Sequence, residues 1–322
     1  MGERADKPQS KEIKKMATRD AYGEALLELG RTREDVVVLD ADLSGSTKTK
    51  KFGKEFPKRF FNIGVSEQDL IGTASGLSLT GKLPFASTFA VFETGRAWEQ
   101  IRQTVCYSRL NVKLVATHSG ITVGEDGASH QAVEDVALMR VLPNMTVIVP
   151  ADGNETRQVI HAVAAYNGPV YVRLGRSKIP QVMPEGYSFK IGKAYTFHLG
   201  KDATIIAMGI MVSAALDAAE ILKRDGLDVG VINMSTVKPL DTESVLKAAE
   251  KSKLIVTAEE HSIIGGLGSA VSEFLSERHP ARVVRIGIKD DFGCSGTSPE
   301  LLNLYGLTSE NIVKIIKDTL NK

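Results

Sequence analysis

The feature that most constrains the fold of this chain is a regular alternation of short apolar segments with amphipathic ones. The segment DVVVLDAD at 35–42 is an apolar run that ends in acids, as a buried parallel strand does. The segment ATRDAYGEALLELG at 17–30 has apolar residues at helical spacing, and its last glycine favours the end of a helix. The alternation continues along the chain. It predicts an α/β fold with mainly parallel sheets and helices on both faces.

The remaining expected elements follow the same rhythm. Strands are expected at 60–64, 83–88, 112–118, 145–152, 169–175, 203–209, 228–234, 253–260 and 282–288. Helices are expected at 66–81, 95–108, 211–226, 268–278 and from Ser309 onwards. Ser66 is placed to cap its helix, and Asp69 completes a capping-box pattern.

The alternation is interrupted once, by a stretch at 179–202 in which prolines and glycines are mixed with alternating polar and apolar residues. We read it as a linker with a β-type excursion. The sequence therefore predicts two consecutive α/β domains, at 16–185 and 195–322, joined by a linker at 186–194. A charged segment at 1–15 without an apolar core is expected to be a flexible tail and not a signal peptide.

The charge balance limits the classes of partner. There are 40 basic and 39 acidic residues, which gives a formal net charge of +1. This balance gives no reason to expect nucleic acid or a membrane as the partner. No apolar run reaches the length of a membrane span. The two cysteines, Cys106 and Cys294, do not form a metal-binding or redox motif and indicate reduced thiols in a cytoplasmic protein.

Three side chains that follow strands can be read in two ways. Glu67 opens a helix, where an acid is favoured by the helix dipole alone. If Glu67 is instead buried among apolar neighbours, its carboxyl could stay protonated and act in chemistry. Phe89 and Phe92, in TFAVF, suit core packing or an aromatic platform for a flat heterocycle.

The loop HSGITVGEDGASHQ, from His118 to Gln131, follows an expected strand. Its histidines, His118 and His130, lack the spacing of a zinc site. Its glycines let the backbone approach a ligand, and Asp126 and the histidines can exchange hydrogen bonds with hydroxyl groups. We therefore favour a loop that contacts a hydroxylated substrate over a metal site.

The segment GGLG at 265–268 precedes a helix. It suits anion binding at a helix N-terminus or close helix–strand packing, and packing is favoured because the segment does not fit the dinucleotide-binding fingerprint. A phosphate-binding P-loop sequence does not occur in the chain.

Five segments in succession resemble the pyrimidine-binding domain of thiamine-diphosphate enzymes of the transketolase type. They are NIGVSEQDLIGTASGL, FASTFAVFETGRAWEQIR, THSGITVGEDGASHQAVED, PNMTVIVPAD and VYVRLGR. The later segment IGIKDDFGCSGTSPELLNLYGLT resembles the end of the C-terminal domain of the same enzymes. The resemblance covers nearly the whole chain from about residue 16. The segment GEDGASHQ is similar to transketolases in particular.

The resemblance implies roles for the cofactor-facing residues. Glu67 corresponds to the glutamate that hydrogen-bonds N1′ of the aminopyrimidine and favours its imino tautomer, for which Glu67 must be protonated. Phe89 and Phe92 correspond to the aromatic residues that hold the ring. Gly95 departs from the pattern, because transketolases often carry a third aromatic there.

The resemblance also implies roles in substrate binding. His118 and His130 correspond to histidines that contact the donor and acceptor hydroxyls and assist proton transfer. Asp126 corresponds to the residue that reads the C2 hydroxyl of the acceptor. Arg19 and Arg176 correspond to arginines that hold a sugar phosphate, and Ser46 to a phosphate-contacting serine.

The family's other catalytic half is missing from this sequence. Single-chain transketolases begin with a domain that binds the diphosphate through Mg²⁺ with a GDG motif followed by an asparagine, and this chain contains no GDG. The resemblance therefore implies the C-terminal subunit of a split transketolase. Its thiamine diphosphate would be held through Mg²⁺ or Ca²⁺ on an N-terminal partner subunit, in an α2β2 assembly with self-association of this chain.

The implied reaction moves a two-carbon ketol unit from a ketose phosphate to an aldose phosphate. Two other functions remain open. The GRAWEQIR helix is more similar to deoxyxylulose-phosphate synthases and to the beta subunits of 2-oxo acid dehydrogenases, so a different carboligase or a decarboxylase subunit is one alternative. A non-catalytic structural partner is the other.

Overall fold

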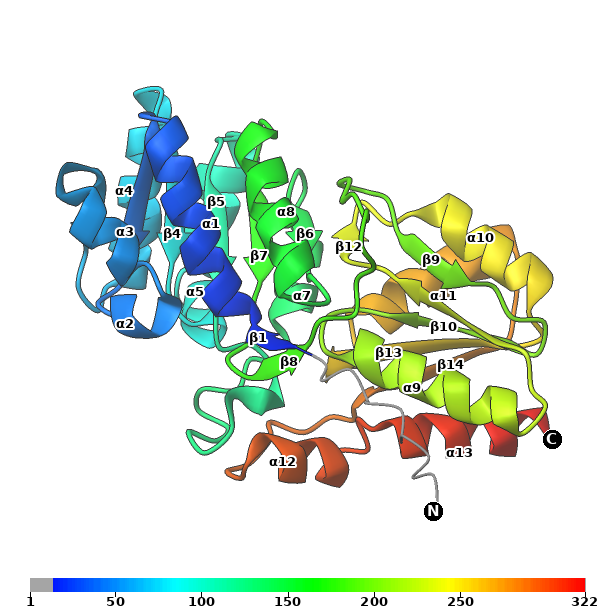
Figure 1. Cartoon of the computed structure of the whole chain (residues 1–322). Coiled ribbons are helices and arrows are strands. Elements are labelled where there is room, and N and C mark those ends of the chain that lie inside the picture. Colours follow the sequence, from blue (N-terminus) through cyan, green and yellow to red (C-terminus); the bar gives the residue numbers. More distant parts are fainter. Residues whose placement is uncertain (1–13, 322) are drawn as a thin grey trace, which may run out of the picture.

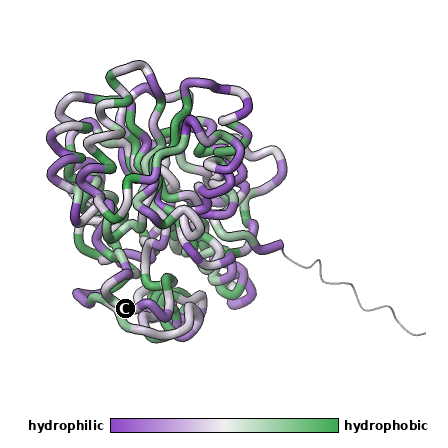
Figure 2. The backbone as a smooth tube through the Cα atoms, turned by 90° about the vertical axis from the view of Figure 1, so that its left-hand side faces the viewer, coloured by the Kyte–Doolittle hydropathy of each residue, from purple (hydrophilic) through white to green (hydrophobic). Residues whose placement is uncertain are grey.

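The structure is a computed structural model that describes residues 14–321 (Figure 1). The expected flexible tail at 1–15 lies almost wholly outside the described residues, and Lys15 begins the first strand. The chain forms two consecutive α/β units, which confirms the expected fold class. Hydrophobic segments gather in the interior, and hydrophilic segments surround them (Figure 2).

The first unit contains a seven-stranded sheet and a two-stranded ribbon. Its strands are β1 (Lys15–Ala17), β2 (Val36–Asp40), β3 (Phe60–Asn62), β4 (Leu83–Ser87), β5 (Lys113–Ala116), β6 (Thr146–Ile148), β7 (Val170–Arg173) and β8 (Lys178–Pro180). Its helices are α1 (Thr18–Thr32), α2 (Ser44–Thr47), α3 (Lys50–Glu55), η1 (Pro57–Arg59), α4 (Glu67–Leu79), α5 (Ala90–Arg96), α6 (Trp98–Gln100), η2 (Ile101–Tyr107), η3 (Ile121–Val123), α7 (Asp135–Arg140) and α8 (Gly153–Ala165).

The second unit contains a five-stranded sheet. Its strands are β9 (Tyr195–His198), β10 (Ala203–Ala207), β11 (Val229–Asn233), β13 (Ile255–Ser262) and β14 (Val283–Ile288), in the order β14-β13-β10-β11-β9. Its helices are α9 (Met211–Arg224), α10 (Thr242–Lys251), α11 (Leu267–Arg278), α12 (Ser298–Leu304) and α13 (Ser309–Leu320). A further strand of this half, β12 (Thr236–Lys238), joins the sheet of the first unit instead.

The large sheet has the order β12-β6-β7-β5-β4-β2-β3. All of its neighbouring pairs are parallel except β12 with β6. Side chains alternate between its two faces: Val36 and Val38 join the core under α1 and α8, whereas Val37 and Leu39 join the core under α4 and η2. Both faces of the sheet are therefore covered by helices, and the parallel strands have their carboxyl ends at one edge.

Two local expectations are wrong. Ser66 is the N-cap of α4, but its side chain makes no capping hydrogen bond, and Asp69 accepts from the Thr73 hydroxyl instead. With Ser66 at φ −148° and ψ 77°, no such bond to the first turn forms. The helix expected at 95–108 begins earlier, at Ala90, and continues after a break as the π-helix η2, because Gly95 lies inside a helix and does not start one.

The GGLG segment forms a close packing contact, as the sequence favours. The first backbone N–H groups of α11, those of Leu267 and Gly268, donate to the buried carboxylate of Glu259 at 2.7 and 2.8 Å. A side chain at Gly266 would overlap that carboxylate. The helix N-terminus does bind an anion, but the anion is a side chain of the same chain.

Candidate active site

The segments that follow the parallel strands of the large sheet carry most of the site residues expected from the sequence. The chain leaves β2 at Asp40 and reaches Ser46, and it leaves β4 toward Phe89. His118 follows β5, and Arg176 follows β7. Parallel strands end at the same edge, and ligands of open α/β sheets bind beyond that edge. The topology therefore gathers these residues in one region of the first unit (Figure 1).

Four aromatic rings form the centre of this region. The Phe89 and Phe92 rings are stacked, with centroids 5.8 Å apart and planes 16° apart. The His118 ring stacks on Phe89 at 3.7 Å, and the His130 ring meets Phe92 edge-on at 5.3 Å. Four residues from two separate sequence segments thus lie in contact. The cluster offers flat apolar faces beside imidazole nitrogens that can exchange protons.

His118 is held in its neutral form. Arg19 Nη1 lies 2.9 Å from His118 Nε2, and because arginine can only donate, Nε2 accepts. The ring proton is then on Nδ1, which donates to Thr117 Oγ1 at 2.8 Å. Burial of the ring, followed by the charges of Arg19 and Arg176, lowers the pKa of His118 to about 3. Its backbone has a φ of 57°, a strained conformation of the kind found at functional sites.

The residues that the family resemblance assigns to phosphate binding lie around His118. Arg19 also donates to the backbone carbonyl of Ser46 at 3.1 Å, so Ser46 contacts the cluster through its main chain and not through its hydroxyl. Arg176 lies 3.4 Å from Asp126 and 3.5 Å from Glu125, and it donates to the Val123 carbonyl. The arginines are therefore already engaged within the chain, and Asp126 is paired with Arg176 across the loop.

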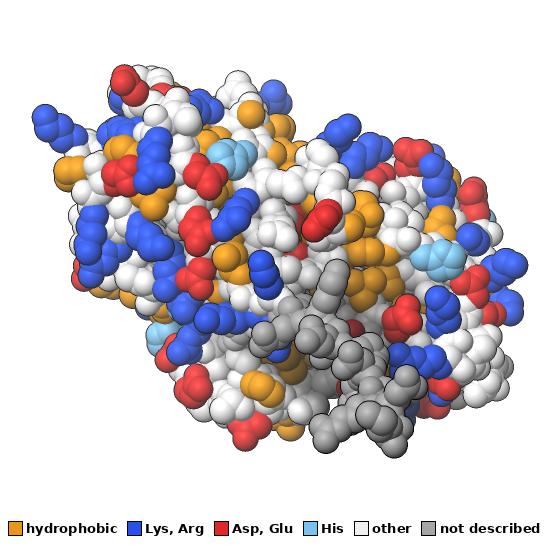
Figure 3. Space-filling view, in the orientation of Figure 1, with side chains coloured by type: hydrophobic (Ala, Val, Ile, Leu, Met, Phe, Trp, Pro, Cys, Tyr) orange, Lys and Arg blue, Asp and Glu red, His pale blue; other side chains and the backbone are white. Residues whose placement is uncertain are grey.

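Basic side chains lie around His118, and part of their charge is balanced by acids, since Lys48 pairs with Asp20 and Arg176 with Asp126. The positive groups that lower its pKa are Arg19, Arg176, His130 and Lys48. On the face of the first unit that carries α1, basic side chains are interspersed with acidic ones (Figure 3). The basic groups beside His118 favour an anionic ligand.

Glu67 lies in the first turn of α4 and is 5% exposed. The burial agrees with the functional reading of this residue, but its partner was not expected. Arg96 Nη1, from the end of α5, lies 3.0 Å from Glu67 Oε1. The same guanidinium lies over the Phe92 ring, 4.2 Å from its centroid. Arg96 thus connects Glu67 to the aromatic cluster.

Sequence reasoning missed a second buried carboxyl beside Glu67. Glu93, on α5, is fully buried, and neither of its carboxyl oxygens has a hydrogen-bond partner among the described residues. Burial raises the pKa of Glu93 well above its usual range, and repulsion from Asp40 and Glu67 raises it further. The sequence held a signal for this: Glu93 is three residues after Ala90 and four before Ala97, on the buried side of the helix.

Asp40 was also missed as a site residue. It ends β2, and its carboxylate accepts from the hydroxyls of Thr47 and Thr49 at 2.6 and 2.8 Å and from the backbone N–H of Leu43 at 2.6 Å. These bonds fold the turn that carries Ser46 against the strand end. Asp40 therefore holds the loop whose Ser46 carbonyl accepts a hydrogen bond from Arg19.

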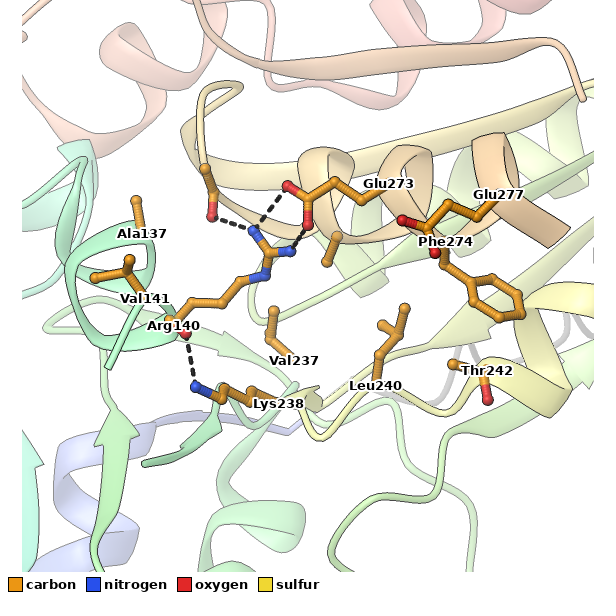
Figure 4. Close-up of a pocket in the computed structure, with 12 residues that line it drawn as sticks. Ala137, Arg140, Val141, Val237, Lys238, Leu240, Thr242, Glu273, Phe274 and Glu277 are labelled. Carbon is orange, nitrogen blue, oxygen red and sulfur yellow. Dashed lines mark hydrogen bonds and ion pairs between the residues drawn. The ribbon is translucent and has the colours of Figure 1, made fainter. Parts of the chain in front are cut away.

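A broad hollow of the described chain lies elsewhere. It has a volume of about 730 Å³, and Figure 4 shows its lining residues, which come from α7, the β12 segment and α11. Arg140 and Glu273 pair inside it, and Lys238 Nζ donates to the Arg140 carbonyl at 2.8 Å. None of the site residues expected from the sequence lines this hollow. Lys238 also donates to the Leu142 carbonyl at 2.5 Å, so of these charged groups Arg140 and Lys238 are held within the chain.

Residues 14–321 contain neither a metal-binding cluster nor a membrane-spanning helix. No cluster of three or more His, Cys, Asp or Glu side chains there has the arrangement of a metal site. No helix in that range is both long and apolar enough to cross a membrane.

Comparison with known proteins identifies related sequences over nearly the whole chain. Residues 14–181 match the family described as the transketolase pyrimidine binding domain, and residues 192–312 match the transketolase C-terminal domain. A Methanocaldococcus jannaschii protein, named provisionally as the C-terminal section of a transketolase, is 53% identical over 307 residues, which are 94% of this chain and 96% of that protein. A Clostridium subunit of a 6-deoxy-6-sulfo-D-fructose transketolase is 42% identical over 296 residues, 92% of each chain.

Among solved structures, the chain is similar to one described as a split gene transketolase in an inactive beta4 tetramer. The TM-score is 0.89 and the sequence identity 53%, over 95% of this chain and 99% of that one. The sequence and the fold thus point to the same group of proteins.

Proposed function

The chain belongs to the transketolase family, as the C-terminal subunit of a split transketolase, and we propose that it carries the substrate-binding and proton-transferring residues of a ketol transfer. In this proposal a two-carbon unit passes from a ketose phosphate to an aldose phosphate. The observation that carries it is the neutral His118, whose Nε2 accepts a hydrogen bond, set beside an aromatic stack and among basic side chains.

The residues present fit the aminopyrimidine part of thiamine diphosphate. Phe92 offers a flat face that already holds a planar guanidinium, and Glu67 offers a buried carboxyl at the edge of that face. When bound, the cofactor supplies the nucleophilic carbon that takes up the ketol unit. Glu67 would hold the ring nitrogen N1′, and Phe89 and Phe92 would orient the ring. The diphosphate and its Mg²⁺ would lie on the partner subunit.

The remaining site residues act on the sugar. A neutral imidazole can take a proton from a hydroxyl group, so His118 would serve as a base, assisted by His130. Asp126 would accept from an acceptor hydroxyl. Arg19 and Arg176 present forked donors that suit a phosphate, with the Ser46 loop beside them. Both arginines would exchange their present partners for the ligand.

We also propose the assembly and the setting. The active form would be an α2β2 complex with an N-terminal subunit, in which this chain self-associates, and the chain alone would bind the cofactor poorly. The two free cysteines fit a reducing cytoplasm.

The proposal is tested by reconstitution. The chain is combined with an N-terminal transketolase subunit that carries the GDG and asparagine motif, together with Mg²⁺ and thiamine diphosphate. Consumption of xylulose 5-phosphate in the presence of ribose 5-phosphate is then measured. Turnover that is lost in Glu67→Gln but kept in Glu220→Gln, an exposed glutamate of α9, is the expected result. A complex that turns over no phosphosugar pair would contradict the proposal.

A second substrate class has a specific observation behind it. The similar Clostridium protein is named for a sulfonated fructose, and a sulfonate presents oxygens to Arg19 and Arg176 as a phosphate does. The same assay with a sulfonated ketose distinguishes the two anions. Consumption of pyruvate without ketose activity would instead indicate a different carboligase, the class that the GRAWEQIR helix resembles.

A further inference from the structure

Arg96 contacts both groups of the site that suit a flat ring, the Glu67 carboxyl and the face of Phe92. Its Nη1 lies 3.0 Å from Glu67 Oε1, and its guanidinium carbon lies 4.2 Å from the centroid of the Phe92 ring. A guanidinium is planar, donates in its own plane and stacks on aromatic faces. An aminopyrimidine ring held by a carboxyl at its edge and a phenylalanine at its face would use the same two partners.

We propose that Arg96 fills the place of the cofactor's aminopyrimidine ring in the cofactor-free chain and must leave that place when the cofactor binds. The inference rests on the proposed function. It makes Arg96 a residue that sets the affinity for the cofactor by competing with the ring, although nothing in the sequence pattern singles it out.

The charges around Glu67 explain why the place is filled. Glu67 is 5% exposed, and the pKa of its neighbour Glu93 is raised by burial and by the charges of Asp40 and Glu67. A buried carboxylate among other acids is costly without a cation. Among the residues that the structure describes, Arg96 is the cation that pairs with Glu67.

The geometry of α5 lets Arg96 leave at small cost. Its side chain is 53% exposed, so it can turn into water. The neighbouring Gly95 has no side chain, and a Cβ built there meets no atom within 4 Å, so the helix surface beside Arg96 is open. The backbone stays in place because Gln68 Nε2 donates to the Arg96 carbonyl at 3.3 Å. Only the side chain has to move.

The test is calorimetric binding of thiamine diphosphate to the complex with the N-terminal subunit at fixed Mg²⁺. The variant Arg96→Met keeps much of the length of the side chain but cannot pair with Glu67. Because a half-exposed ion pair is weak, its removal should tighten binding by about two- to fivefold. Arg224→Met, at an exposed arginine that ends α9, is the matched control and should bind as the unmodified complex does. Thermal melting checks that each variant is folded.

The opposite results are equally informative. Weaker binding of thiamine diphosphate by Arg96→Met would show that Arg96 holds the bound ring itself, in the role of the aromatic residue that transketolases often carry at the position of Gly95. That result would overturn the inference. Unchanged binding would also overturn it. If the unmodified complex does not bind thiamine diphosphate, the proposed function fails, and this inference fails with it.

A double-mutant cycle isolates the competing contact. In a Glu67→Gln background Arg96 no longer has a carboxylate to pair with, so the gain from Arg96→Met should largely disappear. A gain of the same size in both backgrounds would mean that Arg96 acts through something other than Glu67, and it would overturn the inference.

Discussion

His118 combines a strained backbone with a suppressed protonation state. Its φ of 57° is uncommon for a residue with a side chain, and Arg19 occupies Nε2 as a donor. The surrounding structure must hold both features in place. In this state His118 is a weak base, and it can take a proton from a sugar only when Arg19 turns to a ligand and uncovers Nε2.

The lowered pKa of His118 predicts a specific pH dependence of stability. The unfolded imidazole takes up a proton near pH 6.5, whereas the folded one does so only near pH 3. The stabilisation is therefore fully present above pH 6.5 and is lost as the pH falls from 6.5 toward 3. In His118→Asn, which tolerates the same φ, this loss should be absent. Urea unfolding at pH 8, 6 and 5 measures the free energy of unfolding of both proteins. Below pH 6.5 that free energy should fall by up to about 1.4 kcal/mol more per pH unit in the unmodified chain than in His118→Asn. The same pH dependence of the free energy of unfolding in both proteins would contradict this prediction.

Glu93 predicts a pH dependence of stability with the opposite sign. Its pKa is raised by burial, so the folded chain keeps a proton that the unfolded chain releases above about pH 4.5. Stability then falls as the pH rises above that value. In Glu93→Gln, which is uncharged, that loss should vanish. The free energy of unfolding of the variant should therefore rise relative to that of the unmodified chain between pH 5 and pH 8. The free energy of unfolding by urea measures this, with Glu220→Gln as an exposed control. A variant that loses stability relative to the unmodified chain over this range would contradict the prediction.

At the residue scale, the sequence indicated side chains that follow strands, because a strand end is visible in the pattern. Glu67, His118 and Arg176 were found in this way or through the family resemblance. Arg96 was missed because a charged residue in a helix is usually solvated, and Glu93 because the helix was expected to begin only at residue 95, which left its buried position unrecognised. Their positions depend on how α5 lies against α4, and a single helix does not reveal that contact.

At the scale of elements, long periodic segments were predicted well and boundaries were not. The expected helices at 17–30 and 211–226 correspond closely to α1 and α9, since each has a clear apolar stripe. The π-helix η2 and the break before it could not be expected, because π geometry has no strong sequence signal. Phe92 and Arg96 lie four residues apart in the regular helix α5, so their contact follows from helical spacing. It was missed because the helix was expected to begin only at residue 95.

The start of α11 supplies a prediction about an element. Gly266 precedes a helix whose first N–H groups are bound by Glu259, and a methyl group at Gly266 would overlap that carboxylate. Gly266→Ala should therefore lower the free energy of unfolding by about 1–3 kcal/mol. Gly76, inside α4, has no atom within 4 Å of a built Cβ, so Gly76→Ala should raise it by about 0.5–1 kcal/mol. Thermal unfolding of the two variants compares them directly, and equal shifts would contradict the assigned role of Glu259.

At the scale of the whole molecule, the two units share one core. Val147 and Val149 of the first unit lie in the same hydrophobic cluster as Met208 and Met234 of the second. The strand β12 completes the edge of the first sheet by pairing with β6. The sequence predicted two units, but it could not predict this exchange, because the partners of a three-residue strand are set by long-range packing.

Buried polar contacts also cross between the units. Arg173, at the end of β7, pairs with Asp135 at 2.8 Å and donates to the backbone carbonyl of Glu260 at 3.0 Å. Glu260 in turn accepts from the backbone N–H of Thr122 at 2.7 Å, in the loop that carries the histidines. The second unit therefore braces the substrate loop of the first, and the loop's geometry depends on the fold of both.

This sharing predicts that the chain unfolds in one cooperative transition. The single tryptophan, Trp98, lies in the first unit and donates to the Leu138 carbonyl at 3.0 Å, so its fluorescence reports that unit, whereas far-ultraviolet circular dichroism reports both. The two signals should change at the same urea concentration. Arg173→Met leaves Asp135 buried without its cation and should lower the free energy of unfolding by roughly 3–5 kcal/mol, with both signals shifting together. Arg278→Met, at an exposed arginine that ends α11, should shift neither. Separate transitions for the two probes would show that the units are stable independently, and the bracing of the substrate loop by the second unit would then have to be abandoned.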